Sequence, residues 1–465
     1  MRLISIRTSA VSLPCFCSGF LGNGRPQRFS TSLSYIIFSK TSPLTPEEVD
    51  RCRIFLPKTS WKVNPMGSIS TASSMDHGVC ILDTMSLNKR VDIEVLLDTW
   101  EAPTTPPAAL TLAAQTSPLN VDFLCALIFT ALWTRPPIRY GFSLSDCWAW
   151  LRYFPAIAPT QDLRLCDAWT TLDPHHKTVL SGDFGVGFTT WFLNQTLGFV
   201  KYSDTLWVVN TLSPGAFRLA SSARRGPRKS PDYIAEDSQG NLSVLECKGG
   251  QCSRKALLDS MEAGVPQKTN VQALGGTQLQ HSLVAGLFIP QFDDPDSAVI
   301  VIGDPERDEF RDRLSHFSRE EIGRSVSQVA HAKELAMLEL PNTANTLVRA
   351  LGSEETITSA IGRDLSRERA PNRQIATDGL RVEREYRWSE SAKVAENLVI
   401  SGVRFEGSLP FGDVERLKTI IAPADYGEQK RSESLGKNWI VEQSETSVAL
   451  QSPFGPRFKV ILLEE

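Results

Sequence analysis

The sequence has no long apolar run, no strong net charge and no visible internal repeat. Its longest apolar stretch extends only from Val121 to Trp133, whereas a helix needs about 20 apolar residues to cross a bilayer. This excludes a membrane-spanning helix and predicts no membrane partner. The net charge of −4 over 465 residues excludes binding of nucleic acid through overall charge, so any such binding must be local. At this length we expect about two to four domains.

Cysteine and histidine lack the spacing of a disulfide framework or of a zinc centre. The nine cysteines, odd in number and mostly in apolar surroundings, predict a reducing compartment, and hence the cytoplasm. Cys15-x-Cys17 has no partner pair, and His175-His176 has none either. A site built from paired cysteines and histidines is therefore excluded.

Acidic residues are missing from the first 46 residues, which are rich in serine and carry Arg2, Arg7, Arg25, Arg28 and Lys40. This composition resembles an organellar transit peptide, which would place the protein in an organelle. A secretory signal fits less well because Arg7 interrupts the early apolar core. A third alternative is translation from Met66. Residues 1–65, a disordered or targeting-like leader, therefore carry no fold prediction.

Two short segments hold the residues of a chemical site: Pro231-Asp232-Tyr233 and Glu246-Cys247-Lys248. Each adjoins a β-prone run, 233–235 in the first case and 242–245 in the second. Between them, Asp237-Ser238-Gln239-Gly240-Asn241 places glycine third in a three-residue loop, a common hairpin closure because glycine accepts the left-handed conformation. The sequence therefore predicts a β-hairpin.

The register of this hairpin decides whether the polar residues meet. If Asp237 pairs with Asn241, Asp232 lies opposite Glu246, although a bulge at Gly240 would shift the register by one residue. Since side chains alternate along a strand, Glu246 and the lysine two residues later share a face, and the intervening cysteine points away. The two carboxylates and the ammonium are therefore expected to converge on one patch.

Two facing carboxylates and a lysine suit the hydrolysis of phosphodiester bonds. Asp232 and Glu246 repel one another, and partial burial raises the pKa of at least one of them unless a cation lies between. Mg²⁺ prefers such oxygen ligands and keeps part of its water shell, and Lys248 can stabilise charge on the phosphate or hold the attacking water. The alternative is a surface hairpin with an ordinary acid–lysine pair. The acid on the partner strand, the tight turn and the basic flank favour the site.

Pro231-Asp232 and Glu246-x-Lys248 resemble the motif of the PD-(D/E)xK nuclease superfamily, which has the restriction-endonuclease-like fold. The resemblance covers about residues 166–306 and implies a mixed α/β protein with an α-β-β-β-α-β core. It implies dependence on Mg²⁺ or Mn²⁺, with Asp232, Glu246 and the backbone carbonyl of Cys247 as metal ligands and Lys248 as a catalytic residue. The implied substrate is nucleic acid, with DNA favoured because most members with this motif act on it.

The same resemblance implies supporting residues on the two helices or just after them. The family often has an acidic residue on the first helix, and Asp183 is the candidate, although glutamate is common there and the shorter side chain departs from the pattern. Gln267 is the candidate for a supporting polar residue, and Lys268 for a phosphate contact. The alternatives are that Asp183 only interacts with the helix dipole, and that Gln267 and Lys268 lie in a solvated loop.

A basic cluster precedes Asp232, in a stretch without acidic residues after Asp204. It consists of Arg218, Arg224, Arg225, Arg228 and Lys229. Such a patch attracts phosphates without reading sequence, whereas most basic loops are ordinary solvated surface. Its position beside the predicted site favours the binding of nucleic acid.

Helices and strands are predicted on both sides of the hairpin. One helix runs from Leu180 to about Gly198 with Ser181 as its N-cap, and another from Ser253 to Gly264, ended by Gly264 and Pro266. No lysine–serine pair follows the glycines of the first helix (Gly182, Gly185 and Gly187), so they indicate close helix–sheet packing and not a phosphate loop. Apolar runs without alternation predict strands buried on both faces at 283–289 and 298–302.

Three further regions flank the predicted core. Residues 66–165 are expected to be helical, with helices over Val91–Trp100 and Val121–Trp133. Residues 307–373 are predicted to form a charged, solvated helical pair, and residues 374–465 a small α+β domain. By analogy these appendages supply target choice or dock a partner, either a second copy of the chain or another protein.

The sequence thus predicts a metal-dependent nuclease of restriction-endonuclease-like fold. One alternative is a catalytically inactive member of the same fold that binds nucleic acid or a protein. Another is a structural scaffold in which the motif is a coincidence, and this alternative expects Asp232, Glu246 and Lys248 to lie far apart in the folded chain.

Overall fold

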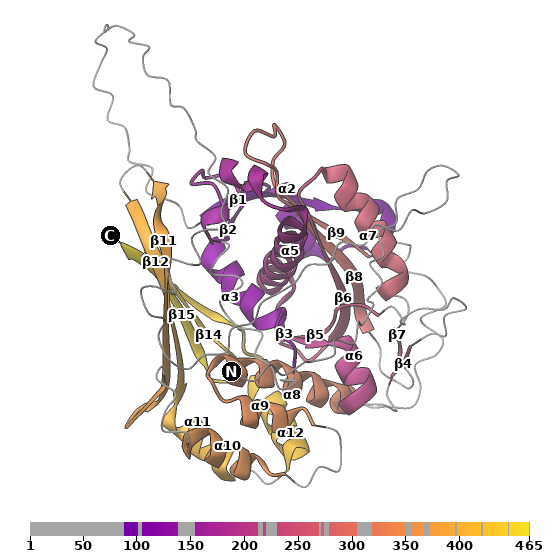
Figure 1. The fold of residues 1–465 in the computed structure, drawn as a ribbon. Coiled ribbons are helices and arrows are strands. Elements are labelled where there is room, and N and C mark those ends of the chain that lie inside the picture. The colour runs from indigo at the N-terminus through magenta and orange to yellow at the C-terminus, as the bar shows by residue number, and fades with distance from the viewer. Residues whose placement is uncertain are drawn as a thin grey trace, which may run out of the picture. The chain divides into compact units, whose positions relative to one another are not determined.

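A computed structural model shows a mixed α/β fold with two large sheets (Figure 1). The structure describes residues 88–100, 105–137, 154–212, 217–219, 230–268, 271–273, 279–304, 319–349, 355–366, 373–395, 398–419, 422–444 and 446–464. All of them belong to one compact unit, Cys80–Glu465. Among these residues, no helix combines the length and the apolar character needed to cross a membrane.

The first sheet has seven strands in the order β2-β1-β9-β8-β6-β5-β3. The pairs β1·β9 and β6·β8 are parallel and the other neighbours are antiparallel. In chain order the strands are β1 (Asn88–Val95), β2 (Leu119–Asp122), β3 (Phe199–Asp204), β5 (Tyr233–Asp237), β6 (Leu242–Gly250), β8 (Leu279–Phe288) and β9 (Val299–Gly303). The predicted strands at 283–289 and 298–302 are confirmed as β8 and β9, and their apolar runs are buried.

Two helices cover opposite faces of this sheet around β6 (Figure 1). Helix α5 (Pro174–Leu197) precedes β3, and α7 (Arg254–Lys268) makes the crossover between the parallel strands β6 and β8. Between β3 and β5 lie α6 (Thr205–Trp207), the turn η5 (Val208–Leu212) and β4 (Phe217–Leu219), which pairs with β7 (Val271–Ala273). Under α7, Leu257 and Met261 pack on apolar side chains of β8 and β9.

The ends of both predicted helices need correction. Helix α5 begins seven residues before Ser181, at Pro174, because Asp173 is the N-cap and accepts a hydrogen bond from the His175 amide. Asp183 is therefore inside the helix, and the interaction with the helix dipole at the N-terminus is wrong. Helix α7 continues through Gly264 and Pro266 to Lys268. Gly264 therefore lies inside the helix, where a larger residue would meet the side chains of β6.

The N-terminal described region is not purely helical, and the predicted helix over Val91–Trp100 is wrong. Residues 88–95 form strand β1, and the turn η2 (Leu97–Thr99) follows. Val91 and Ile93 are buried while Arg90 is exposed, which is the two-residue period of a strand. The second predicted helix is confirmed as α3 (Phe123–Trp133), which is buried along its length and packs on α5; α2 (Ala108–Gln115) precedes it.

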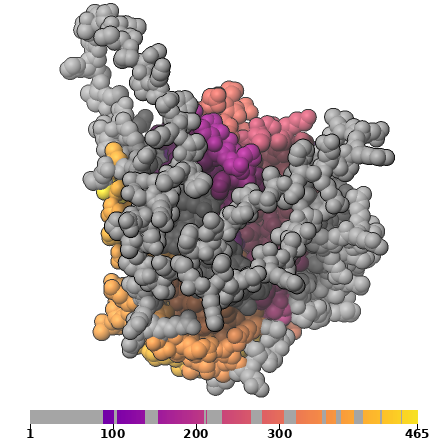
Figure 2. Space-filling view, viewed as in Figure 1, coloured from indigo at the N-terminus to yellow at the C-terminus, as the bar shows by residue number. Residues whose placement is uncertain are grey.

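The second sheet has six antiparallel strands in the order β10-β11-β12-β15-β14-β13, and with its helices it matches the predicted α+β character of residues 374–465. Its strands are β10 (Arg373–Ala376), β11 (Gly379–Ala395), β12 (Leu398–Pro410), β13 (Ile440–Gln443), β14 (Ser447–Gln451) and β15 (Arg457–Glu464), with α11 (Phe411–Thr419) and α12 (Pro423–Ser434) between β12 and β13. Segments of this region reach the surface at the bottom of the view in Figure 2.

The region before it is helical as predicted, with α8 (Arg319–Met337), α9 (Pro341–Leu347) and α10 (Ile357–Ser366). The predicted solvation is wrong for α8, which is buried along most of its length. Several of its polar side chains have partners inside the protein: His331 contacts the Tyr426 hydroxyl at 2.8 Å, and the Ser452 hydroxyl donates to Glu334 at 2.5 Å. Buried polar groups need such partners, and these partners lie too far along the chain for a local pattern to reveal them.

The turn between β5 and β6 is fixed by these C-terminal elements. Glu236 of β5 is fully buried between Lys201 Nζ at 2.9 Å and Arg431 Nε of α12 at 2.8 Å. The Gly436 amide donates to the Ser238 carbonyl at 2.7 Å. The hairpin that carries the candidate site is therefore anchored at its closed end.

Candidate active site

The β5–β6 hairpin has the predicted register, without a slip. Tyr233 pairs with Leu245 and Glu236 with Leu242, so Asp232 precedes the first pair on one strand and Glu246 follows it on the other. The Asp237 amide donates to the Asn241 carbonyl at 3.0 Å, and Gly240 has φ +77°. Glycine supplies the left-handed residue that this turn requires.

The candidate residues form one hydrogen-bonded cluster at the open end of the hairpin. The Asp232 amide donates to Glu246 Oε2 at 3.1 Å, and the Cys247 amide donates to Asp232 Oδ2 at 2.8 Å. Lys248 Nζ makes an ion pair with Glu246 Oε1. The expectation that these residues lie far apart is therefore wrong.

Within the described part of the chain, the negative charge of the two carboxylates exceeds the positive charge around them. The Glu246 side chain is 0% exposed, and burial followed by repulsion from Asp232 raises its pKa from 4.5 to about 7 although Lys248 acts in the other direction. Burial raises the pKa of Asp232 as well. The Cys247 amide and Lys248 act in the other direction, and the charge of Asp204 adds to the rise. Asp232 still reaches solvent. The predicted rise in the pKa of at least one of the two carboxylates is thus found for both.

Helices α5 and α7 both pack closely on β6 beside the cluster. A Cβ at Gly264 of α7 would lie 3.1 Å from Lys248 Cε and 3.2 Å from Glu246 Cγ, and a Cβ at Gly185 of α5 would lie 2.5 Å from the Lys248 carbonyl oxygen. The predicted role of glycine in close packing is thus confirmed at Gly185, whereas Gly182 faces open space.

Cys247 points away from the carboxylates, as predicted. Its thiol accepts a hydrogen bond from the Thr189 hydroxyl of α5 at 3.3 Å, and burial raises its pKa well above the usual value. Glu246 and Lys248 face α7 and the cysteine faces α5, so the alternation of β6 separates the polar cluster from the packed core.

Of the other predicted site residues, only Asp183 has a side chain that the structure describes. Asp183 lies half-buried on α5, and its charge adds to the burial that raises the pKa of Tyr233. Gln267 and Lys268 are in the last turn of α7, and Arg218 is in β4, but their side chains lie outside the described part. The other basic residues, Arg224, Arg225, Arg228 and Lys229, lie wholly outside it.

Two residues that were not predicted as part of the site, Asp204 and Lys333, lie beside the cluster. Asp204, the last residue of β3, pairs opposite Tyr233, and its carboxylate lies 2.5 Å from Lys333 Nζ of α8. The Thr205 amide donates to the Asp232 carbonyl at 3.1 Å. An acid at the end of the strand before the motif was a usable signal for Asp204, whereas nothing in the local pattern indicates Lys333.

The donor atoms fit a divalent cation held partly by water. In the described part of the chain, no group of three or more histidine, cysteine, aspartate or glutamate side chains is placed to hold a metal. A cation bound by Asp232 and Glu246 would therefore need further oxygen ligands, such as the Cys247 carbonyl and water, which suits Mg²⁺. The raised pKa of Glu246 fits this role, because repulsion from Asp232 contributes to it and a cation would relieve that repulsion.

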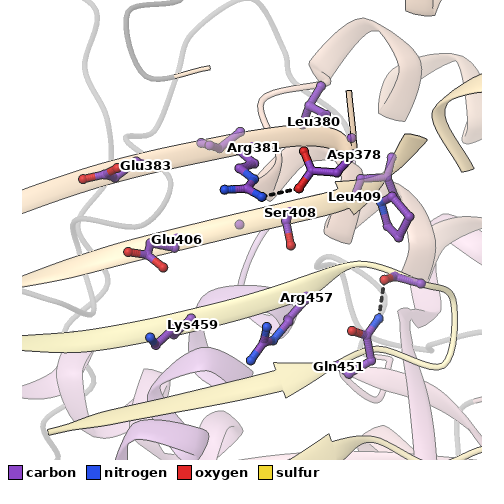
Figure 3. Close-up of a pocket in the computed structure, with 15 residues that line it drawn as sticks. Asp378, Leu380, Arg381, Glu383, Glu406, Ser408, Leu409, Gln451, Arg457 and Lys459 are labelled. Carbon is purple, nitrogen blue, oxygen red and sulfur yellow. Dashed lines mark hydrogen bonds and ion pairs between the residues drawn. The ribbon is translucent and has the colours of Figure 1, made fainter. Parts of the chain in front are cut away.

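A separate groove of about 470 Å³ lies on the six-stranded sheet, over β11, β12 and β15 (Figure 3). Its charged side chains have both signs, and Figure 3 shows Arg381 turned toward Asp378, with which it forms an ion pair. Arg457 pairs with Glu442 in the same way. No residue of the cluster at Asp232 lines this groove, and its paired charges give it no evident preference for phosphate.

Comparison of the chain with models of protein families, with curated proteins and with solved structures returned no match.

Proposed function

We propose that this protein is a metal-dependent nuclease of restriction-endonuclease-like fold that hydrolyses phosphodiester bonds, with DNA as its substrate. The observation that carries the proposal is the cluster of Asp232, Glu246 and Lys248, interlocked through two backbone amides at the end of a sheet. The order α5, β3, β5, β6, α7, β8, interrupted only by the short elements α6, η5, β4 and β7 in the described residues, supports it, because an α-β-β-β-α-β core is what the motif implies.

In this proposal Asp232, Glu246 and the Cys247 carbonyl hold Mg²⁺ or Mn²⁺. The bound metal would supply polarisation of a phosphate oxygen and activation of a water. The amides of Asp232 and Cys247 fix one oxygen of each carboxylate, so both side chains are oriented before any ligand arrives. Lys248, 20% exposed, is accessible enough to donate to a phosphate oxygen or to orient water.

The same proposal places the protein in a reducing compartment, the cytoplasm. Cys125, Cys166, Cys247 and Cys252 are free thiols, which supports this location.

The test is degradation of plasmid and single-stranded DNA with Mg²⁺ or Mn²⁺ by the wild type, Glu246→Ala and Lys248→Ala. Lys255→Ala is the matched control, because Lys255 is an exposed lysine on α7. We expect each site variant to lose about 10²- to 10³-fold in rate and the control to keep full activity, once circular dichroism shows that all are folded. Equal cleavage by the wild type and both site variants would identify a contaminant and refute the proposal. DNA binding without metal-dependent cleavage would support an inactive binding module instead.

A further inference from the structure

Lys333 of α8 joins three chain segments at the edge of the candidate site. Its side chain is fully buried, and Nζ donates to the Trp133 carbonyl at 3.0 Å and lies 2.5 Å from Asp204 Oδ2. The ammonium also lies 5.5 Å from the centre of the Tyr233 ring. One side chain thus contacts the end of α3, the end of β3 and the start of β5.

A buried ammonium is unfavourable unless it is paired, since it gives up its hydration. Burial lowers the pKa of Lys333, and Asp204 acts in the opposite direction. An apolar side chain of similar length would fill the same space without this cost, so packing alone does not account for a lysine here. Its specific contacts do, because an apolar residue has no donor for Trp133 or Asp204.

Lys333 is connected to Asp232 through the residues next to Asp232 in the chain and in the sheet. Tyr233, the next residue, donates its hydroxyl to the same Trp133 carbonyl at 2.8 Å. Asp204 pairs opposite Tyr233, and the amide of Thr205 holds the Asp232 carbonyl at 3.1 Å. Both strands that flank Asp232 are therefore connected to one ammonium group.

We propose that Lys333 is a positioning residue of the candidate site: it holds the end of β3 and the start of β5 so that the Asp232 carboxylate reaches the Cys247 amide beside Glu246. Its effect on catalysis rests on the proposed nuclease function, whereas its effect on position does not. A helix from the C-terminal half of the chain thereby contributes to the geometry of a site built from the central sheet.

The experiment uses the full chain with Lys333→Met, Asp204→Asn and the double variant. Each single change leaves an unpaired partner, and Lys333→Met or Asp204→Asn alone can fail to fold for that reason. The double variant removes the ion pair as a unit, a change that is often neutral for stability. Lys255→Met, an exposed lysine on α7, is the control.

The first readout is hydrogen exchange of the Thr205 and Cys247 amides, with Ile300 in the buried strand β9 as an internal reference. In the folded double variant we expect both amides to exchange about 5- to 10-fold faster while Ile300 is unchanged. Unchanged exchange at Thr205 and Cys247 would overturn the proposal. It would mean that Lys333 only stabilises the fold, because the local geometry would then be intact in a double variant that folds as stably as the wild type.

The second readout is the Mn²⁺ concentration that gives half-maximal cleavage of plasmid DNA. We expect it to rise about 10-fold in the double variant and to stay at the wild-type value in Lys255→Met. A wild-type value in a double variant with fast exchange would overturn the link to metal binding. If the wild type itself does not cleave, the nuclease function fails, and the exchange measurement still decides whether Lys333 positions Asp232.

Discussion

Glu246→Gln is expected to stabilise the folded protein while removing its proposed activity. Glutamine keeps the shape of the side chain and an oxygen that can accept from the Asp232 amide, but it carries no charge. The pKa of Glu246 rises from 4.5 to about 7 in the folded protein, and one pKa unit corresponds to about 1.4 kcal/mol. The ionised carboxylate therefore costs about 3 kcal/mol, and we expect the variant to recover about 2 to 3 kcal/mol at pH 8.

The pH dependence follows from the sign of this change. Because the folded pKa is higher than the unfolded one, the folded state binds more protons between about pH 4.5 and 7, and the wild type loses stability as pH rises through that window. The advantage of Glu246→Gln should therefore be absent at pH 4.5 and complete above about pH 7.5. Urea unfolding in EDTA, followed by circular dichroism at both pH values, measures it.

Two matched substitutions control for the chemistry of glutamate to glutamine. Glu236 lies on the same hairpin but is buried between Lys201 and Arg431, so Glu236→Gln leaves two buried cations without their carboxylate and should cost about 3 to 5 kcal/mol. Glu94 pairs with the exposed Arg254, and its substitution should change stability by less than about 1 kcal/mol.

The reasoning would be refuted by a Glu246→Gln protein that is less stable than the wild type at pH 8, or by a difference that does not vary with pH. Mg²⁺ extends the test. A cation that binds only the folded wild type raises its unfolding free energy, and Glu246→Gln should respond much less.

Two further predictions use residues of the same strand and its covering helix. Gly185→Ala should lower the free energy of unfolding in urea by about 1 to 3 kcal/mol, because its methyl group would lie 2.5 Å from the Lys248 carbonyl oxygen. The control is Gly182→Ala in the same helix, which has nothing within 4 Å and should stabilise the protein by up to about 1 kcal/mol. Equal effects of the two substitutions would contradict the packing argument. Iodoacetamide at pH 8 should alkylate the exposed Cys252 and leave Cys247 unmodified, because Cys247 is buried and has a raised pKa. Peptide mapping by mass spectrometry measures the labelling of each cysteine. Early labelling of Cys247 would show that α5 does not cover β6 as described.

The features of this fold that the sequence predicts correctly depend on residues that are close in sequence. The hairpin register follows from one glycine at a left-handed position and from strand alternation, so the contact between Asp232 and Glu246 follows from residues close in sequence. The buried strands β8 and β9 follow from continuous apolar runs. The start of α5 was also readable, since an aspartate before a proline is a strong N-terminal signal.

The unpredicted part depends on partners that are distant in sequence. The polar residues of α8 have the composition of a solvated helix, and only the side chains that meet them, such as Tyr426 and Ser452, make their burial possible. Strand β1 has an alternating pattern, but its place in the sheet depends on β9, which comes about two hundred residues later. For the same reason no local rule connects Lys333 to Asp204.

The two ends of the hairpin differ in a way that bears on the alternative of an ordinary structural hairpin. At the closed end, one buried carboxylate, Glu236, has two cationic partners. At the open end, Asp232 and Glu246 lie close together, and among the described residues Lys248 is the one cation that lowers the pKa of both. Charge that only stabilised the fold would be balanced at both ends, since unbalanced burial costs free energy. Among the described residues, this deficit of positive charge at Asp232 and Glu246 supports the proposed metal site over a surface hairpin with an acid–lysine pair.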